Sequence, residues 1–180
     1  MTTRTLVLER REVYRGRVFS LSVDRVTLPS GYTTTMDIVR HPGSVVLVPV
    51  PEPGHVILIR QYRYAVDQDL WELPAGTLTA GEAELAGAAR ECEEEIGLVP
   101  GRLELLGRLL PTPGFCDETM AFYRCLDLAA PAPDSTARKD EDEVIEPRTF
   151  ALDEVRHMIA RGEIVDMKTV AGLALLGRAL

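Results

Sequence analysis

The sequence lacks the features that mark secreted, membrane-spanning and nucleic-acid-binding proteins. Three cysteines in 180 residues form no CxxC pair, so neither a disulfide framework nor a zinc site is indicated. No apolar run reaches the length of about 20 residues that spans a membrane. The N-terminal stretch MTTRTLVLERREVYRG has no signal-peptide core, and a net charge of −8 does not attract nucleic acid or acidic lipid. We expect a cytoplasmic protein that binds neither nucleic acid nor membranes.

What the sequence does contain is an ordinary globular composition, with 46% hydrophobic and 27% charged residues. Residues 18–41 predict two β-rich arms around a Pro-Ser-Gly turn, and SVVLVPV and VILIRQYR predict a hairpin around PEPGH. These last two runs are almost wholly apolar, as in strands covered on both faces. We place a boundary at 42–43, between an N-terminal β arm (1–43) and a main domain (44–180).

The second half of the chain mixes helical and strand-like patterns. A helical pattern covers about 82–96, and strand-like segments follow around 102–110 and 119–127. The stretch AAPAPDSTARKDEDE is typical of a loop, and two further helices are expected at LDEVRHMIARG and MKTVAGLALLGRAL. This mixture predicts a layered α/β domain.

The stretch RECEEEIG, residues 90–97, carries four glutamates and closes with a glycine that can end a helix. At about 100° per residue, Glu91 and Glu95 share one face of this helix and Glu94 lies beside them. The predicted core stripe lies on a different face and consists of Leu85, Ala89, Cys92 and Ile96.

Two interpretations of these carboxylates remain open from the residues alone. A lone acidic helix is most often a solvated surface. However, like charges four residues apart repel by a few tenths of a kcal/mol, and acids in the last turn oppose the helix dipole by roughly 0.3–1 kcal/mol each. Several broken local rules at one place are typical of a functional site, and a hard divalent cation would turn the repulsion into attraction.

The spacing around this helix resembles the Nudix box. The chain reads GTLTAGEAELAGAARECEEEIGL from Gly76 and matches the 23-residue signature except at Cys92, where the family usually has a branched aliphatic residue. Cysteine can replace it as a small buried hydrophobe. The resemblance implies an α/β fold, a Nudix α/β/α sandwich with a mixed β-sheet, here with a small N-terminal antiparallel β arm.

The resemblance also implies metal-dependent hydrolysis of a nucleoside diphosphate linked to another group. Glu91 and Glu95 would be the main ligands of Mg²⁺, with Mn²⁺ as the alternative ion. Glu94 would share the metal cluster, and the backbone carbonyl of Ala75 would complete it. The remaining motif positions would be structural, and these are Gly76, Glu82, Arg90 and Gly97.

The flanking segments resemble the ADP-ribose pyrophosphatase branch of the family. They are QYRYAVDQDLWELPAG before the box, Pro113 in PTPGFCDE after it, and DEDEVIE. This branch implies hydrolysis of ADP-ribose to AMP and ribose 5-phosphate by metal-activated water. Arg63 would meet the diphosphate, since a guanidinium suits paired phosphate contacts; the alternative is a surface arginine. Glu72 would contact the nucleotide or support the metal loop.

The general base is expected in the loop KDEDEVIEP. Glu143 fits best because it directly precedes the apolar pair that re-enters the sheet, and Glu141 is the second candidate. Without the box, the same acidic run would be interpreted as a solubilising loop. A base on such a loop can close over the site when substrate binds.

The N-terminal arm of this branch is typically exchanged between two subunits, which implies a homodimer whose arm closes over the partner's adenine. Phe19 or Tyr32 could stack on the base. Candidate polar contacts are Asp37, Arg40 and His41, with ordinary strand-end residues as the alternative. Some relatives stack a tryptophan there, whereas the only tryptophan of this chain is Trp71.

Two other functions remain open. The missing stacking tryptophan keeps GDP-mannose, or another nucleotide sugar, as an alternative substrate. A non-catalytic domain that senses ADP-ribose is the second alternative, and the complete set Glu91, Glu94 and Glu95 argues against it.

Overall fold

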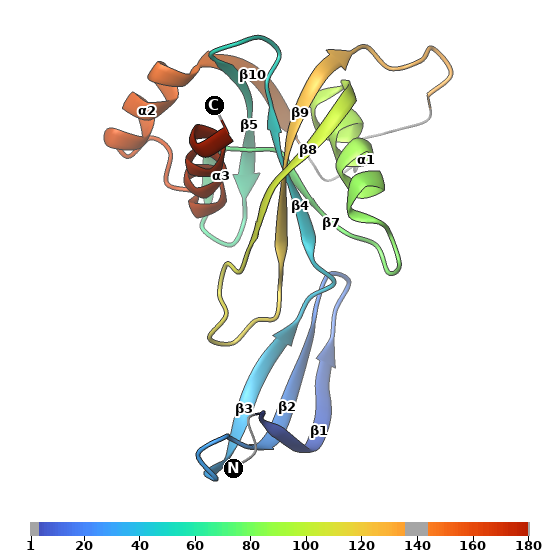
Figure 1. The fold of residues 1–180 in the computed structure, drawn as a ribbon, viewed down its shortest axis with the longest axis vertical. Helices are drawn as coiled ribbons and strands as arrows, with labels where there is room; N and C mark the ends of the chain where they lie inside the picture. The colour runs from blue at the N-terminus through green and yellow to red at the C-terminus, as the bar shows by residue number, and fades with distance from the viewer. Residues whose placement is uncertain (1–3, 136–143, 180) are drawn as a thin grey trace. The chain divides into compact units, whose positions relative to one another are not determined.

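The structure, a computed structural model, describes residues 4–135 and 144–179 (Figure 1). The chain forms two compact units, Met1–Gly43 with Leu110–Thr119, and Ser44–Leu109 with Met120–Leu180. We expected the segment 110–119 to belong to the main domain, but it packs with the N-terminal strands. Within the described ranges, no helix has both the length and the apolar character needed to cross a membrane.

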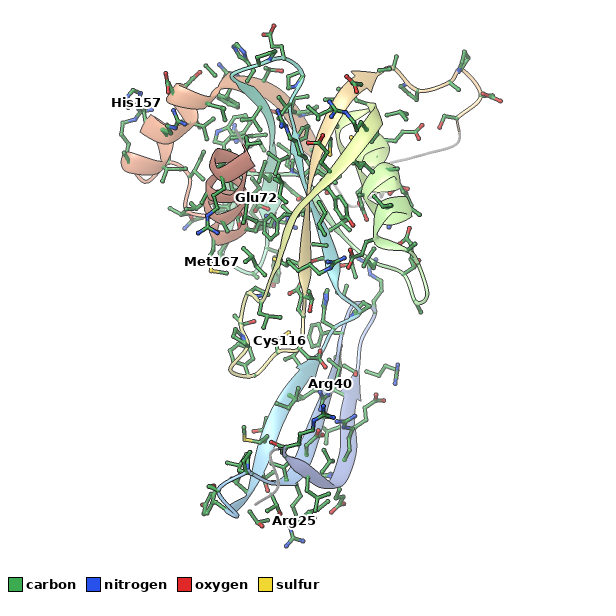
Figure 2. All side chains as sticks on the ribbon, in the orientation of Figure 1. Arg25, Arg40, Glu72, Cys116, His157 and Met167 are labelled. Atoms are coloured by element: carbon green, nitrogen blue, oxygen red, sulfur yellow. The ribbon has the colours of Figure 1, made fainter. Side chains whose placement is uncertain are left out.

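The N-terminal unit is built on an antiparallel sheet of β1 (Leu6–Arg15), β2 (Ser20–Thr27) and β3 (Thr33–Arg40), in the order β1-β2-β3. The segment 110–119 is attached to the end of β3. The Val39 N–H donates to the Phe115 carbonyl at 2.8 Å, and the Asp117 N–H donates back to Val39 at 3.2 Å. Arg40, labelled with Cys116 in Figure 2, adds an ion pair to Asp117 at 3.0 Å.

The main unit contains two sheets. One is four-stranded and mixed, in the order β7-β4-β9-β8, and the other is antiparallel, in the order β10-β5-β6. The strand bounds are β4 (Ser44–Pro49), β5 (His55–Arg63), β6 (Gln68–Glu72), β7 (Ala75–Thr77), β8 (Val99–Leu109), β9 (Met120–Ala129) and β10 (Ile145–Ala151). The mixed character comes from β4, which is parallel to β9 and antiparallel to β7.

In the described part of the chain, three helices cover these sheets, α1 (Glu84–Ile96), α2 (Leu152–Ala160) and α3 (Met167–Ala179). Figure 1 shows α1 on one side of the strands and α2 and α3 on the other. Two apolar clusters match this layering, because alternate residues of β4 point to opposite faces. Val46 and Val48 pack in the cluster that contains residues of α2 and α3, whereas Val45 and Leu47 pack with residues of α1.

The predicted hairpin of β4 and β5 is wrong. Both strands exist at the expected places, and the apolar runs are buried as predicted, but the two strands belong to different sheets. The reason is that both hydrogen-bonding edges of β4 are occupied, one by β7 and the other by β9. A sequence with two adjacent apolar strands does not distinguish pairing within one sheet from packing of two sheets.

The helix α1 ends as predicted, and Cys92 and Ile96 of the expected core stripe are buried, but the centre of the buried face is shifted. Gly97 has φ of 69°, and its N–H donates to the Glu93 carbonyl at 3.0 Å, so the left-handed cap is confirmed. Leu85, expected on the core stripe, is 55% exposed. The buried residues of the helix are Gly87, Ala88, Glu91, Cys92, Glu95 and Ile96. The buried face is therefore rotated towards the glutamates.

Candidate active site

The acidic face of α1 is a buried surface rather than a solvated one. Glu91 and Glu95 are only 8% and 3% exposed, and both lie on the side of the helix that carries Cys92. Burying a carboxylate without compensation costs several kcal/mol, so such groups need cations or hydrogen-bond donors. The contacts of these two side chains therefore decide what the site can do.

The short strand β7 provides backbone contacts to both carboxylates. The Ala75 N–H donates to Glu95 Oε2 at 2.9 Å. Gly76 faces Glu91 so closely that a Cβ added at this position would lie 1.8 Å from both Cδ and Oε1 of that glutamate. A side chain at 76 would therefore have to displace this carboxylate, and close approach of this kind is a usual reason for glycine.

A single guanidinium neutralises part of the acidic helix. Arg90 Nη1 contacts Glu91 Oε1 and Glu94 Oε2, each at 2.7 Å, and Nε donates to Glu82 Oε1 at 2.9 Å. Hydrogen bonding to Glu82 raises the pKa of Arg90, and the same bond holds the pKa of Glu82 down to about 2. Glu82 also accepts from the Thr79 N–H at 3.0 Å, which ties the loop before α1 to the helix.

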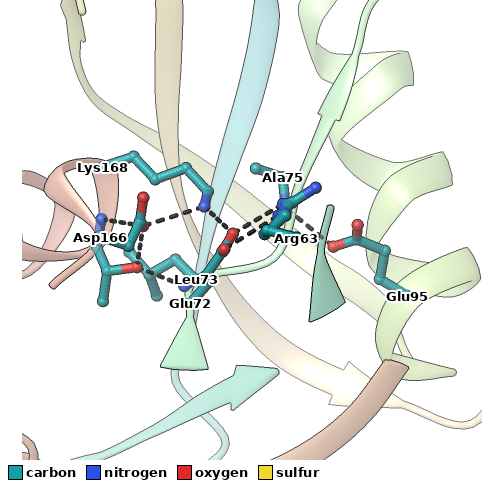
Figure 3. A network of polar contacts seen from close by, with 8 residues as sticks. Arg63, Glu72, Leu73, Ala75, Glu95, Asp166 and Lys168 are labelled. Atoms are coloured by element: carbon teal, nitrogen blue, oxygen red, sulfur yellow. Dashed lines mark hydrogen bonds and ion pairs between the residues drawn. The ribbon is translucent and has the colours of Figure 1, made fainter. Parts of the chain in front are cut away.

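A second polar network lies beside the first, at the end of β5 (Figure 3). Arg63 donates from Nε and Nη2 to the two oxygens of Glu72, at 3.0 and 2.7 Å. Glu72 is 2% exposed, and it also accepts a hydrogen bond from Lys168 Nζ. The bond to Glu72 raises the pKa of Arg63, with further contributions from Glu95 and Asp166. The negative field of α1 therefore reaches Arg63.

Three residues of this network were not identified from the sequence, namely Asp166, Lys168 and Thr169. Asp166 directly precedes α3 and accepts from the Thr169 N–H at 2.9 Å, as a helix N-cap does. This Asp-x-x-Thr spacing before a predicted helix is the signal that could have located the cap. It does not reveal the partner, because Lys168 and Glu72 lie 96 positions apart in the chain.

The other predicted site residues lie in the N-terminal unit or outside the described part. The Phe19 ring is 5.9 Å from that of Tyr14 and is 44% exposed. Asp37 is exposed on β3. The His41 backbone N–H donates to Asp117 Oδ1 at 2.9 Å. Both candidate bases, Glu141 and Glu143, lie outside the described residues.

The donor set suits a hard divalent cation, although its carboxylates have other partners here. Among residues 4–135 and 144–179, no three acidic, cysteine or histidine side chains converge in a way that could hold a metal. Glu91 and Glu94 contact Arg90, and Glu95 contacts Ala75. Even so, Glu91, Glu94 and Glu95 lie within five residues of one helix, with Glu91 and Glu95 on its buried face. Carboxylate oxygens grouped in this way are the ligands that magnesium takes.

Comparison with known proteins supplies independent findings. The family model described as NUDIX domain matches residues 40–171. The "Methanol dehydrogenase activator" of Bacillus methanolicus is 35% identical over 169 residues, which cover 94% of this chain and 90% of that protein. The "ADP-ribose pyrophosphatase" of Bacillus subtilis (strain 168) is 30% identical, with the same two coverages.

A solved structure of an "ADP compounds hydrolase" has a TM-score of 0.82 and 21% identity to this chain. The match covers 100% of this chain and 96% of that one. This likeness confirms the predicted α/β/α fold with a mixed sheet.

Proposed function

The chain belongs to the NUDIX family, and from this premise we propose that it hydrolyses the pyrophosphate bond of ADP-ribose, with Mg²⁺, to AMP and ribose 5-phosphate. One observation carries the proposal: Glu91 and Glu95 are buried on the face of α1 that meets the backbone of β7, with Glu94 beside them on the same helix. Clustered carboxylate oxygens of this kind are the ligands that a divalent cation takes. The name of the Bacillus subtilis relative supports the choice of substrate.

The residues that would hold the cation are Glu91, Glu94, Glu95 and the carbonyl of Ala75. Mg²⁺ is preferred and Mn²⁺ is the alternative. Bound there, a divalent cation would supply neutralisation of phosphate charge and a lowered pKa of the attacking water. Arg90 already contacts Glu91 and Glu94 and would keep these carboxylates oriented.

Arg63 is proposed to bind the diphosphate. One edge of its guanidinium, Nε and Nη2, donates to Glu72. The remaining nitrogen, Nη1, donates no hydrogen bond to protein within the described part of the chain. A guanidinium held along one edge keeps the other available for a phosphate oxygen, with little rotamer freedom left to lose. Glu72 would then act by orienting Arg63, a role that differs from the two expected from the sequence, contact with the nucleotide or support of the metal loop.

The proton of the attacking water is proposed to be accepted by Glu143, with Glu141 as the second candidate. We further propose a cytoplasmic homodimer in which the N-terminal unit contributes to adenine binding, with Phe19 stacking on the base and Asp37 and His41 making polar contacts. The ring of Phe19 is partly exposed and Asp37 is exposed, so both are accessible to a ligand.

GDP-mannose remains the second candidate substrate, and one observation favours keeping it. Trp71 packs edge-on against Phe150, with 4.9 Å between ring centroids and 81° between planes, in the apolar cluster beneath α2 and α3. The sole tryptophan is thus committed to packing. Adenine would therefore have to be recognised by other aromatic residues. Without a stacking tryptophan, this argument does not favour adenine over guanine, and GDP-mannose stays a candidate.

A substrate panel tests the proposal. The purified full chain is incubated with Mg²⁺ and ADP-ribose, ADP-glucose, UDP-glucose or GDP-mannose, and nucleoside monophosphate release is measured by chromatography. We expect the highest kcat/KM for ADP-ribose. A higher value for GDP-mannose would replace the substrate, and tight binding of ADP-ribose without any turnover would favour the sensing function.

A further inference from the structure

The N-terminus of α3 is organised around one aspartate. Asp166 Oδ2 accepts hydrogen bonds from the Thr169 N–H at 2.9 Å and the Thr169 hydroxyl at 2.6 Å, and it contacts Lys168 Nζ at 3.0 Å. Thr169 is fully buried and Lys168 nearly so. Figure 2 labels Met167, the first residue of this helix, and Figure 3 shows the network itself. The helix start is thus fixed by polar contacts inside the protein.

Two neighbouring residues of a distant segment bind to this helix start. Lys168 Nζ donates to the carboxylate of Glu72, and the Leu73 N–H donates to Thr169 Oγ1 at 2.7 Å. The Thr169 hydroxyl accepts a hydrogen bond from the Leu73 N–H and donates one to Asp166. It makes both bonds only when its proton points towards Asp166. Glu72 and Leu73 therefore cannot shift without breaking buried hydrogen bonds.

The segment continues from these anchors directly to the acidic helix. The Pro74 carbonyl accepts from the Leu47 N–H at 2.8 Å, and the Ala75 N–H donates to Glu95 Oε2 at 2.9 Å. Each of the four residues 72–75 thus has a polar anchor. A continuous series of contacts runs from the start of α3 to a carboxylate of α1.

We propose that Lys168 and Thr169 are positioning residues for the cation site, acting through the segment 72–75 on Glu95. This inference rests on the proposed function, since it assumes that Glu95 binds a divalent cation. Residues that do not touch the metal but hydrogen-bond to its ligands orient those ligands, and losing such a residue typically costs 10- to 100-fold in metal affinity or activity. A merely structural network would stabilise α3 without changing the affinity for metal.

The physical argument concerns the freedom of Glu95. Its carboxylate accepts from the Ala75 N–H, which lies in a strand paired with β4, and the residues two and three places before Ala75 are held by the start of α3. If Lys168 no longer holds Glu72, or Thr169 no longer holds Leu73, the segment gains alternative positions, and the Ala75 N–H no longer fixes one orientation of Glu95. The cation then meets a ligand that must be reoriented on binding, which weakens its affinity.

The test is Mn²⁺ binding by the full-length chain without substrate, measured from the electron paramagnetic resonance signal of unbound Mn²⁺. Lys168→Met and Thr169→Val remove the two anchors at similar side-chain size, whereas Thr169→Ser keeps the hydroxyl. Arg178→Met, at the exposed other end of the same helix, is the matched control. We expect Kd to rise about 10-fold in the first two variants and to stay within about twofold of the parent in the other two.

Thermal unfolding of each variant is recorded in parallel, together with kcat and KM at several Mn²⁺ concentrations. Positioning predicts that excess Mn²⁺ restores much of the lost turnover of Lys168→Met, with little change in KM for the substrate. Parental Kd values in both Lys168→Met and Thr169→Val would overturn the inference, whatever their melting temperatures. If Lys168→Met does not fold, the Thr169→Val and Thr169→Ser pair decides.

The parent protein separates this inference from the proposed function. A parent that binds Mn²⁺ and hydrolyses ADP-ribose, beside variants that bind Mn²⁺ equally well, would reject only the positioning role. A parent that binds no Mn²⁺ and releases no nucleotide would remove both.

Discussion

Replacing Gly76 with alanine tests whether Glu91 must stand where the structure places it. The added Cβ would lie 1.8 Å from Cδ and Oε1 and 2.2 Å from Oε2 of Glu91. Non-bonded carbon atoms separate at roughly 3.5–4.0 Å, so the carboxylate has to move by about 1.7–2.2 Å. Gly76 lacks the positive φ of Gly97, so alanine is compatible with the backbone and the effect is steric.

The displacement should cost little stability and much activity. The clashing group is the end of a flexible side chain, and rotating it off its rotamer costs about 0.5–1.5 kcal/mol. Weakening its contact with Arg90 adds up to about 1 kcal/mol. We expect the melting temperature to fall by about 2–8 °C. A misplacement of 1 Å or more at a catalytic centre can cost about 100-fold in rate, or about 2.7 kcal/mol.

The assay is AMP release from ADP-ribose at saturating Mg²⁺, together with thermal unfolding. Gly177→Ala is the control, because its Cβ would enter open space in α3. Alanine there should stabilise the helix by up to about 1 kcal/mol without changing kcat. More than a third of the parental kcat in Gly76→Ala would refute the argument that Glu91 needs its position. Loss of folding would refute the argument that the side chain rotates away cheaply.

Four further substitutions probe the charges of the site. Glu95→Gln should lower kcat by several orders of magnitude but keep the free energy of unfolding, because the amide oxygen can still accept from the backbone; near-parental turnover would remove its role as a metal ligand. Glu143→Gln should slow turnover and leave Mn²⁺ binding intact, and if Glu141→Gln proves the slower enzyme, the base is Glu141. Glu82→Gln tests the pH dependence of stability. The bond with Arg90 depresses the pKa of Glu82 from 4.5 to about 2, so its stabilisation is present above pH 4.5 and disappears as the pH falls towards 2. Urea unfolding across this range should show a shallower pH dependence in the variant, and an unchanged slope would contradict the assignment.

The local part of the site could be predicted from the sequence because its information is local. Glu91, Glu94 and Glu95 lie within five residues of one helix, and Gly97 ends that helix by its own backbone conformation. Helical periodicity then fixes which of these side chains share a face. Periodicity did not fix which face is buried: Leu85 was expected inside and is exposed. Apolar residues do not by themselves define the core face when neighbouring strands can accommodate carboxylates.

The pairing of the strands and the residues that support the site could not be predicted, because both depend on contacts between distant parts of the chain. The partners of β4 are β7 and β9, the second of which begins more than 70 positions later in the chain. Likewise, Lys168 and Thr169 each appear in the sequence as an ordinary polar residue on a predicted helix. Their meaning arises only when α3 is packed against the segment that begins at Glu72.

The proposed ligands lie on α1 and their proposed supporting residues lie on α3, so substitutions in the two places should have different effects. The proposed carboxylate ligands Glu91, Glu94 and Glu95 occupy about one and a half turns of α1, so any substitution among them alters the charge of the proposed cation site directly. Lys168 and Thr169 are not proposed ligands, so each can be substituted while every ligand residue is retained. If the positioning role of Lys168 and Thr169 holds, metal affinity can be adjusted from α3 without changing the chemistry of α1. Ligand variants and anchor variants should then respond differently to metal. Loss of a ligand lowers kcat at any metal concentration, whereas the effect of losing Lys168 or Thr169 is compensated by a higher metal concentration.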